Sequence, residues 1–317
     1  MLDRAALSAL GVDESTVALR ERLDGVDAHA FLAALPALVA RWQDRFGLHG
    51  ARLLGGGALS AAFACVRLVD AAPVVLKLSA PHAPGVGAEA AALAAWGGEG
   101  ACALLDAAAD GEALLLERIE PGTPASAADD ASDARAAAAL LGTLHAVPPP
   151  SAVPTWQLEG DWRFERARTW VATGRAVAAV TLAELDEAGR TARELHDSGS
   201  RVLCHGDFLD KNLLLDGARG LRAIDPMPCV SDRSRDAAFW ALHHQPGVYV
   251  GERCELVARA AGLDGARVRR WALAFAATEA ALDIAPGAAQ RHLGFLRAAR
   301  SGGAARSPAR RLDPRPQ

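Results

Sequence analysis

Apolar residues follow two different patterns along the first part of this chain. Over residues 28–46 they return every three or four positions, which is the spacing of an amphipathic helix. From residue 51 to residue 119 they form five short runs separated by turn residues, a pattern typical of strands. An alanine-rich segment of helical period, residues 86–96, lies between the third and fourth runs. The pattern predicts a helical extension over residues 1–48, then three strands, a helix and two strands.

The second part of the chain is mostly helical in pattern. The sequence Pro-Gly-Thr-Pro at residues 121–124 breaks the chain after the fifth apolar run. Helices are predicted at about residues 129–147, 162–180, 181–198, 252–261, 266–282 and 290–299. Among them, residues 202–204, 213–215 and 221–224 read as a strand–turn–strand stretch. Residues 301–317 are rich in Arg, Pro and Gly, which predicts a disordered tail.

These patterns predict an α+β chain of two lobes. We expect a small β-rich lobe over residues 49–119, a hinge over residues 120–124 and a larger, mainly helical lobe over residues 125–300. A length of 317 residues with 51% hydrophobic residues is enough for two packed lobes with a substantial core.

Charge, hydropathy and cysteine usage narrow the class of protein. No apolar run approaches the roughly 18–20 residues of a membrane span, and the N-terminus carries charges where a signal peptide is apolar. We therefore expect a cytoplasmic protein without a membrane partner. The net charge is −4 and the basic residues are dispersed, which does not favour a nucleic-acid partner. Five cysteines without a C-x-x-C pair indicate reduced, structural thiols.

Lysine is rare in this chain. Of its 34 basic residues only Lys77 and Lys211 are lysine, and the other 32 are arginine. Together with the excess of alanine and glycine, this imbalance indicates a GC-rich coding sequence that favours Arg wherever any positive charge serves. A retained lysine is then a candidate for a specific role, with survival by chance as the alternative.

The most distinctive polar residues lie in the sequence CHGDFLDKN, residues 204–212, and in AIDP, residues 223–226. Asp207 and Asn212 are five residues apart, and Asp225 follows thirteen residues later at the end of an apolar run. Phosphoryl transfer needs a carboxylate that accepts the proton of the attacking hydroxyl, and an amide and a second carboxylate that hold Mg²⁺. The spacing predicts Asp207 as the catalytic base, Asn212 and Asp225 as metal ligands, and Mg²⁺ as a cofactor. A plain surface turn is the alternative.

The first lobe carries candidate contacts to the nucleotide phosphates. Lys77 ends the third apolar run, where a lysine can reach the α- and β-phosphates. Glu89 is the only acidic residue of segment 86–96 and is predicted to hold that lysine, with an exposed surface Glu as the alternative. Gly56, Gly57 and Ser60 at the first turn suit close contact with a phosphate, with a plain hairpin turn as the alternative.

His205-Gly206-Asp207 with Asn212, followed by Ile-Asp-Pro at 224–226, resembles the H-R-D-x-x-x-x-N and D-F-G motifs of protein kinases. Glycine in place of arginine, and I-D-P in place of D-F-G, make the chain similar to aminoglycoside phosphotransferase-like antibiotic kinases. It most resembles the branch of streptomycin 6-phosphotransferases and hydroxyurea phosphotransferases. The resemblance covers residues 50–295, and its motifs include Val-Leu-Lys-Leu at 75–78, Leu-Glu-Arg at 116–118, Leu-His-Ala at 144–146 and Asp-Ala-Ala at 236–238.

This resemblance implies a two-lobed, protein-kinase-like fold with a β-rich N-lobe and a mainly helical C-lobe. It implies that backbone groups of Glu117, Arg118 and Ile119 contact the adenine. It also implies that Asp236 anchors the backbone of the catalytic loop, residues 204–212, with capping of its own helix as the alternative. His243-His244 is not expected to be a metal pair, because adjacent helical residues point apart.

The activity implied by the resemblance is transfer of phosphate from ATP to a hydroxyl of a small-molecule antibiotic, with a streptomycin-like aminoglycoside favoured and resistance as the result. A cationic antibiotic needs carboxylates near the catalytic loop. The candidates are Asp210, Asp232, Glu279 and Asp283, with an exposed acidic face as the alternative.

Three other functions are weighed against this one. A kinase of a hydroxylated metabolite, or of a nucleoside or cyclic-peptide antibiotic, shares the same motifs. A pseudokinase that only binds nucleotide would normally have lost at least one residue of the motifs. It is disfavoured because all four are present: Lys77, Asp207, Asn212 and Asp225. A protein kinase is disfavoured because no A-P-E segment follows Asp225. We expect a monomer or a weak dimer.

Overall fold

The computed structural model describes residues 2–24, 26–55, 60–80, 86–125, 129–244 and 249–300. The predicted phosphate contacts Gly56 and Gly57, and the predicted disordered tail, lie outside these residues. Within the described parts, no helix is both long enough and apolar enough to cross a membrane. All five cysteines are buried and free.

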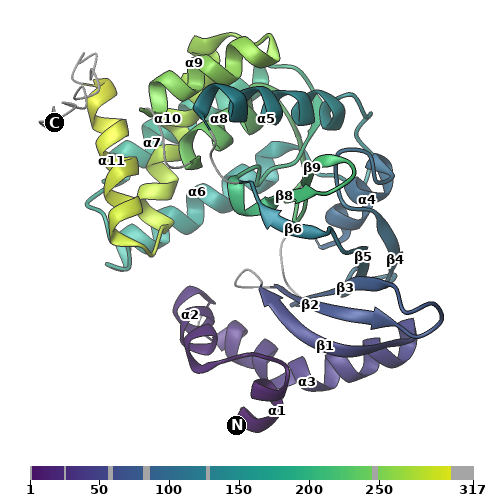
Figure 1. Ribbon diagram of the computed structural model, residues 1–317. Coiled ribbons are helices and arrows are strands. Elements are labelled where there is room, and N and C mark those ends of the chain that lie inside the picture. Colours follow the sequence, from purple (N-terminus) through teal and green to yellow (C-terminus); the bar gives the residue numbers. More distant parts are fainter. Residues whose placement is uncertain are drawn as a thin grey trace, which may run out of the picture.

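An antiparallel sheet of five strands forms the first half of the molecule (Figure 1). Its strand order is β1-β2-β3-β5-β4. The strands are β1 Leu48–Gly55, β2 Ser60–Arg67, β3 Pro73–Ser79, β4 Leu104–Ala107 and β5 Ala113–Glu117. Helix α4, Val86–Trp96, joins β3 to β4 and has the predicted bounds. The predicted order of three strands, a helix and two strands is therefore confirmed.

Three helices precede the sheet: α1 Arg4–Ala9, α2 Glu14–Asp24 and α3 Val26–Phe46. Buried residues of α3, including Phe31 and Leu35, share a core with residues of β2 and β3. Two hydrogen bonds add to this packing. The Leu53 N–H donates to the Leu10 carbonyl at 2.8 Å, and Arg20 Nη2 donates to the Ser60 carbonyl at 2.7 Å. The N-terminal segment thus covers one face of the sheet and contacts Leu53 of β1 and Ser60 of β2.

Successive side chains of β3 alternate between the face of the sheet that packs against α3 and the opposite face. Leu76 and Leu78 are buried in the core shared with α3. Because successive side chains of a strand point to opposite faces, Val75 and Lys77 face away from α3. The sheet therefore presents Lys77 toward the second half of the molecule.

The second half of the molecule is a group of helices packed around α10 (Figure 1). Much of α10 is buried, including Trp271 and Phe275. The helices are α5 Asp130–His145, α6 Trp156–Ala172, α7 Leu182–Asp197, α8 Ser234–His243, α9 Val250–Ala261, α10 Gly265–Leu282 and α11 Pro286–Arg300. Most lie close to their predicted ranges. Helix α6 was predicted over residues 162–180, which is wrong at both ends: it begins at the buried Trp156, and Gly174, with φ of +69°, lies just beyond its C-terminal end.

Two small sheets accompany the helices of the second half. One has the order β6-β8-β9, and the other pairs β7 with β10. Their strands are β6 Pro121–Pro124, β7 Val202–Cys204, β8 Leu213–Asp216, β9 Gly220–Ala223 and β10 Cys229–Ser231. Strands β6 and β10 were not predicted. The Pro-Gly-Thr-Pro sequence expected to be only a hinge pairs with β8 as an edge strand, a position where proline is tolerated.

Candidate active site

A cavity of about 470 Å³ lies between the large sheet and the β6-β8-β9 sheet. Most of the residues predicted to contact nucleotide or metal share this one cavity. They come from β2, β3, the end of β5, the 3₁₀ turn Asp210–Asn212 and the end of β9. Of the predicted residues, those that line it are Ser60, Lys77, Glu117, Arg118, Ile119, Asn212 and Asp225.

Lys77 is held between two carboxylates at the back of the cavity. Its Nζ lies 2.6 Å from both Oε1 and Oε2 of Glu89, and 2.5 Å from Oδ1 of Asp225. Burial by itself lowers the pKa of Lys77, but the two carboxylates outweigh burial and raise it. The charge of Lys77 in turn holds the pKa of Asp225 below its ordinary value. The site therefore contains a fixed ammonium and an ionised carboxylate at neutral pH.

Asp225 has an unusual backbone conformation. Its φ is +55°, a left-handed value that costs energy in residues other than glycine. Asp225 follows strand β9, and this turn brings its carboxylate to Lys77. About a third of the side chain, 36%, stays exposed. One carboxylate oxygen thus contacts Lys77 while the group remains accessible to a ligand.

Asn212 is oriented by the catalytic loop. Its Nδ2 donates to the Asp207 carboxylate at 2.8 Å and to the Asp207 carbonyl at 2.9 Å. The two hydrogen bonds occupy the amide nitrogen, and in the described part of the chain the Asn212 Oδ1 accepts none. Asn212 and Asp225 therefore offer the cavity two oxygen ligands, the type that Mg²⁺ prefers. This donor set fits a magnesium ion.

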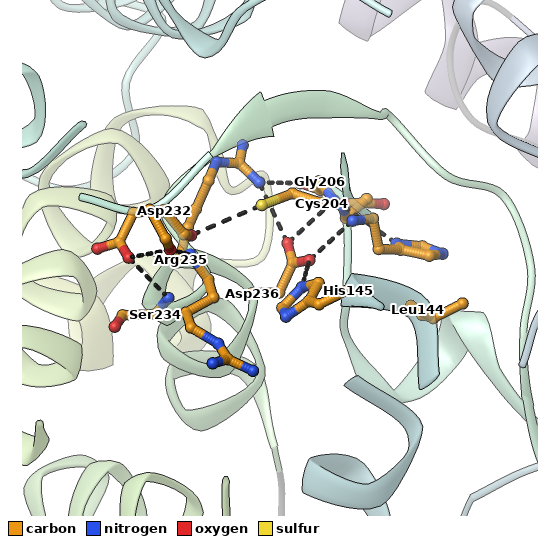
Figure 2. A network of polar contacts seen from close by, with 12 residues as sticks. Leu144, His145, Cys204, Gly206, Asp232, Ser234, Arg235 and Asp236 are labelled. Carbon is orange, nitrogen blue, oxygen red and sulfur yellow. Dashed lines mark hydrogen bonds and ion pairs between the residues drawn. The ribbon is translucent and has the colours of Figure 1, made fainter. Parts of the chain in front are cut away.

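The catalytic loop is anchored from below by Asp236, at the start of α8 (Figure 2). Its carboxylate accepts the backbone N–H of His205 at 2.7 Å and that of Gly206 at 3.0 Å. His145 lies 3.0 Å away, and the Arg235 guanidinium donates to both Asp236 and the Gly206 carbonyl. Although burial raises the pKa of Asp236, His145 and Arg235 lower it. The expected anchoring of the loop is confirmed, and the carboxylate reaches beyond its own helix.

Gly206 has no room for a side chain. Its φ is +84°, and a Cβ at this position would lie 1.7 Å from the Met227 carbonyl oxygen. A backbone segment cannot yield that much space. The glycine that distinguishes this loop from H-R-D is therefore required by the close approach of the chain that follows Asp225.

The four acidic acceptor candidates do not lie together. Each carboxylate has a partner within the protein, and none lines the cavity described above. Asp210 faces Nδ1 of His244 at 2.9 Å. Asp232 is buried against Arg267 and Trp271, Glu279 binds Arg163 at 2.8 Å, and Asp283 accepts the Ala285 N–H at 2.8 Å.

His243 and His244 point to different places, as expected for neighbouring helical residues. His243 Nε2 lies 3.5 Å from Glu279, and the charge of Asp207 also acts on the His243 ring. His244 faces Asp210 of the catalytic loop on one side, and Asp130 and Asp133 of α5 on the other. The pairing of His244 with the loop was not predicted, because nothing in the sequence indicates that these elements meet.

Buried histidines make stability sensitive to acid. Burial lowers the pKa of His292 to about 4, from an ordinary value of 6.5. Below pH 6.5 the unfolded chain gains a proton there that the folded chain does not, so stability falls as the pH falls toward 4. For His292 alone the loss at pH 5 is roughly 2 kcal/mol.

We expect thermal unfolding to show this loss as a lower Tm at pH 5 than at pH 7. His292→Gln is expected to reduce the pH dependence, and His49→Gln, at an exposed histidine of β1, is expected to leave it unchanged. Equal pH dependence in all three proteins would contradict the assignment to His292.

Sequence comparison identifies relatives of this chain. A family model described as aminoglycoside/hydroxyurea antibiotic resistance kinase matches residues 53–286. A streptomycin 6-kinase from Streptomyces griseus is 31% identical over 283 residues, covering 84% of this chain and 88% of the relative. A hydroxyurea phosphotransferase from Kitasatospora aureofaciens is 31% identical over 268 residues, covering 81% of this chain and 75% of the relative.

Solved structures share the fold. A choline kinase from Cryptosporidium parvum has a TM-score of 0.61 at 13% identity, and covers 84% of this chain and 95% of its own. A thermostable mutant of an aminoglycoside phosphotransferase, in a ternary complex with ADP and hygromycin B, has a TM-score of 0.57 at 15% identity. It covers 84% of this chain and 99% of its own. The predicted kinase-like α+β fold is thus confirmed, and the chain belongs to the aminoglycoside/hydroxyurea antibiotic resistance kinases, a family of phosphotransferases.

Proposed function

We propose that this chain transfers the γ-phosphoryl group of ATP to a hydroxyl group of an aminoglycoside of the streptomycin type, and so inactivates it. The observation that carries the proposal is the placement of a base candidate, two metal-ligand candidates and a phosphate-binding lysine around one cavity and its rim. Relatives named streptomycin 6-kinase, at 31% and 30% identity, support this choice of acceptor.

In the proposed reaction, Asp207 accepts the proton of the acceptor hydroxyl. The hydroxyl oxygen forms a bond to the γ-phosphorus while the bond between that phosphorus and the bridging oxygen breaks. The bridging oxygen leaves with the electron pair as part of ADP. Asn212 donates a hydrogen bond to the Asp207 carboxylate at 2.8 Å and so keeps it in one orientation. A base that is held in place in this way contributes about 10²–10⁴-fold to the rate.

The remaining cavity residues bind and orient the nucleotide. Lys77, fixed by Glu89, carries the positive charge for the α- and β-phosphates. Asn212 and Asp225 would hold Mg²⁺, which neutralises phosphate charge when bound. At the other end of the cavity, Glu117 at the end of β5, with Arg118 and Ile119 beyond it, offers backbone groups to the adenine.

The acceptor is proposed to bind beside the catalytic loop, toward α8 and α10. Glu279 is the best of the four acidic candidates for this role, because its carboxylate lies 3.5 Å from Nε2 of His243, a ring on which the charge of Asp207 also acts. Its charge is partly balanced by Arg163 at 2.8 Å. Asp232 is a poorer candidate, because its carboxylate is buried against Arg267 and Trp271.

A phosphate-transfer screen tests the proposed function. The purified protein is incubated with ATP, Mg²⁺ and one acceptor, either streptomycin, hydroxyurea, hygromycin B, a nucleoside antibiotic, a cyclic-peptide antibiotic or choline. Mass spectrometry then detects the gain of one phosphoryl group. We expect streptomycin to be modified and choline to remain unchanged.

Other results of the screen would contradict the proposal in different ways. Modification of choline alone would indicate a metabolite kinase. Modification of hydroxyurea alone would keep the family activity and change the acceptor. No ATP consumption with any acceptor would indicate a pseudokinase.

A further inference from the structure

Lys211 and its two sequence neighbours in the catalytic loop point in different directions. The turn Asp210–Asn212 is a 3₁₀ helix, so its three side chains leave in directions about 120° apart. Asp210 faces His244, and Asn212 faces Asp207. Lys211 takes the third direction and lines the nucleotide cavity.

The contact between Lys211 and Asp207 does not by itself account for a lysine here. The Lys211 Nζ lies 3.9 Å from the Asp207 Oδ2, which is too far for a hydrogen bond. The side chain is also 65% exposed, and ion pairs in water contribute little. An ammonium has three N–H donors, and within the described residues none of them makes a hydrogen bond. The group is therefore available to a ligand.

The basic residues around the cavity differ in their ion-pair partners. In the described lining they are Lys77, Arg118 and Lys211. Lys77 is enclosed by Glu89 and Asp225, and Arg118 lies 3.9 Å from Glu120 beyond the end of β5.

Lys211 stands across the cavity from the sheet that carries Lys77, and both lysines lower the pKa of Asp225. A phosphate chain bound at Asp225 would have Lys77 on the side of the sheet and Lys211 on the side of Asp207.

We propose that Lys211 binds the γ-phosphoryl group of ATP and neutralises its charge during transfer, an inference that rests on the proposed function. As the acceptor oxygen bonds to phosphorus and the bridging oxygen leaves with its electron pair, the three other γ-oxygens keep their negative charge. Lys211 donates hydrogen bonds to them and keeps its own protons. A compact ammonium suits a phosphate approached from one side. This role also explains why this loop retains one of the two lysines among 34 basic residues.

Calorimetric titration with nucleotides tests this role without catalysis. Lys211→Ala is titrated, in Mg²⁺, with ADP and with the non-hydrolysable β,γ-imido analogue of ATP. We expect the affinity for the analogue to fall by about tenfold, as for loss of a charge-assisted hydrogen bond, while the affinity for ADP changes by less than about twofold. Lys211→Arg keeps the charge but not the compact ammonium, so it should recover only part of the discrimination between the two nucleotides.

Two comparison variants complete the experiment. Lys77→Ala should weaken both nucleotides, because its position serves the α- and β-phosphates. Arg270→Ala removes an exposed cation of α10 that pairs with Glu194 of α7 at 3.1 Å. Neither residue lines the cavity, so this variant should change neither affinity.

The outcomes separate this inference from the proposed function. An unchanged ratio of the two affinities in Lys211→Ala, or an equal loss of both, overturns the role of Lys211, even if turnover also falls. If the wild-type protein binds neither nucleotide, the proposed function itself fails. A selective loss of the ATP analogue supports the assignment.

Discussion

Asp207→Asn should lower kcat by about 10²–10⁴-fold while ATP still binds. The amide cannot accept the proton of the acceptor hydroxyl, but its oxygen can still accept the hydrogen bond from Asn212. The loop therefore keeps its shape. Asp207 is not among the residues that line the nucleotide cavity in the described structure, so the Kd for ATP should change by only a few fold. Steady-state kinetics with the identified acceptor and calorimetry with ATP measure the two quantities separately.

A matched variant shows whether the loss is specific to this position. Asp197→Asn removes the same charge from the exposed end of α7, and it should keep wild-type kcat. Near-normal turnover in Asp207→Asn would remove Asp207 from the role of base. A large loss of ATP affinity in the same variant would instead indicate that Asp207 supports nucleotide binding.

Asp236→Asn should destabilise the protein by about 3–5 kcal/mol, as expected when one member of a buried charge network is lost. The Asp236 carboxylate is fully buried and accepts hydrogen bonds from two consecutive backbone N–H groups of the catalytic loop. An amide has only one oxygen, so its N–H₂ group must face one of these donors or His145. The Arg235 guanidinium beside it also loses a carboxylate partner. Urea unfolding measures the free-energy change.

The same variant should also lower kcat, because the anchored loop carries Asp207. Asp70→Asn, on the exposed turn after β2, breaks an ion pair with Arg67 and serves as the control, with a urea midpoint close to wild type. A change in unfolding free energy below about 1 kcal/mol in Asp236→Asn would show that the loop is held by other contacts.

Much of the fold follows from local patterns in the sequence. The alternation of Val75 and Lys77 with Leu76 is enough to place the lysine on the cavity face of β3. The helical period of residues 86–96 gave the bounds of α4. Strand β6 was missed because proline weakens strand patterns, and its pairing with β8 depends on a segment about ninety residues away.

The candidate site was predictable to the extent that its motifs are local. Asp207 and Asn212 share one loop, and their contact follows from their spacing. The acidic acceptor candidates could not be placed in this way. Arg163 is 116 residues from Glu279 in the chain, so no spacing rule links their charges. The proposed role of Lys211 also rests on the packing of its turn and not on its position in the sequence.

The packing of α3 against the sheet affects how this enzyme can be divided or recombined. The match to the kinase family begins at residue 53, within β1, whereas the apolar underside of that sheet is covered by residues 26–46. A chimera or truncation designed from the family boundary would cut through β1 and leave Phe63 and Leu76 exposed to water. Any transferable unit of this catalytic fold therefore has to include α3 and all of β1, so its working N-terminal boundary lies before residue 26.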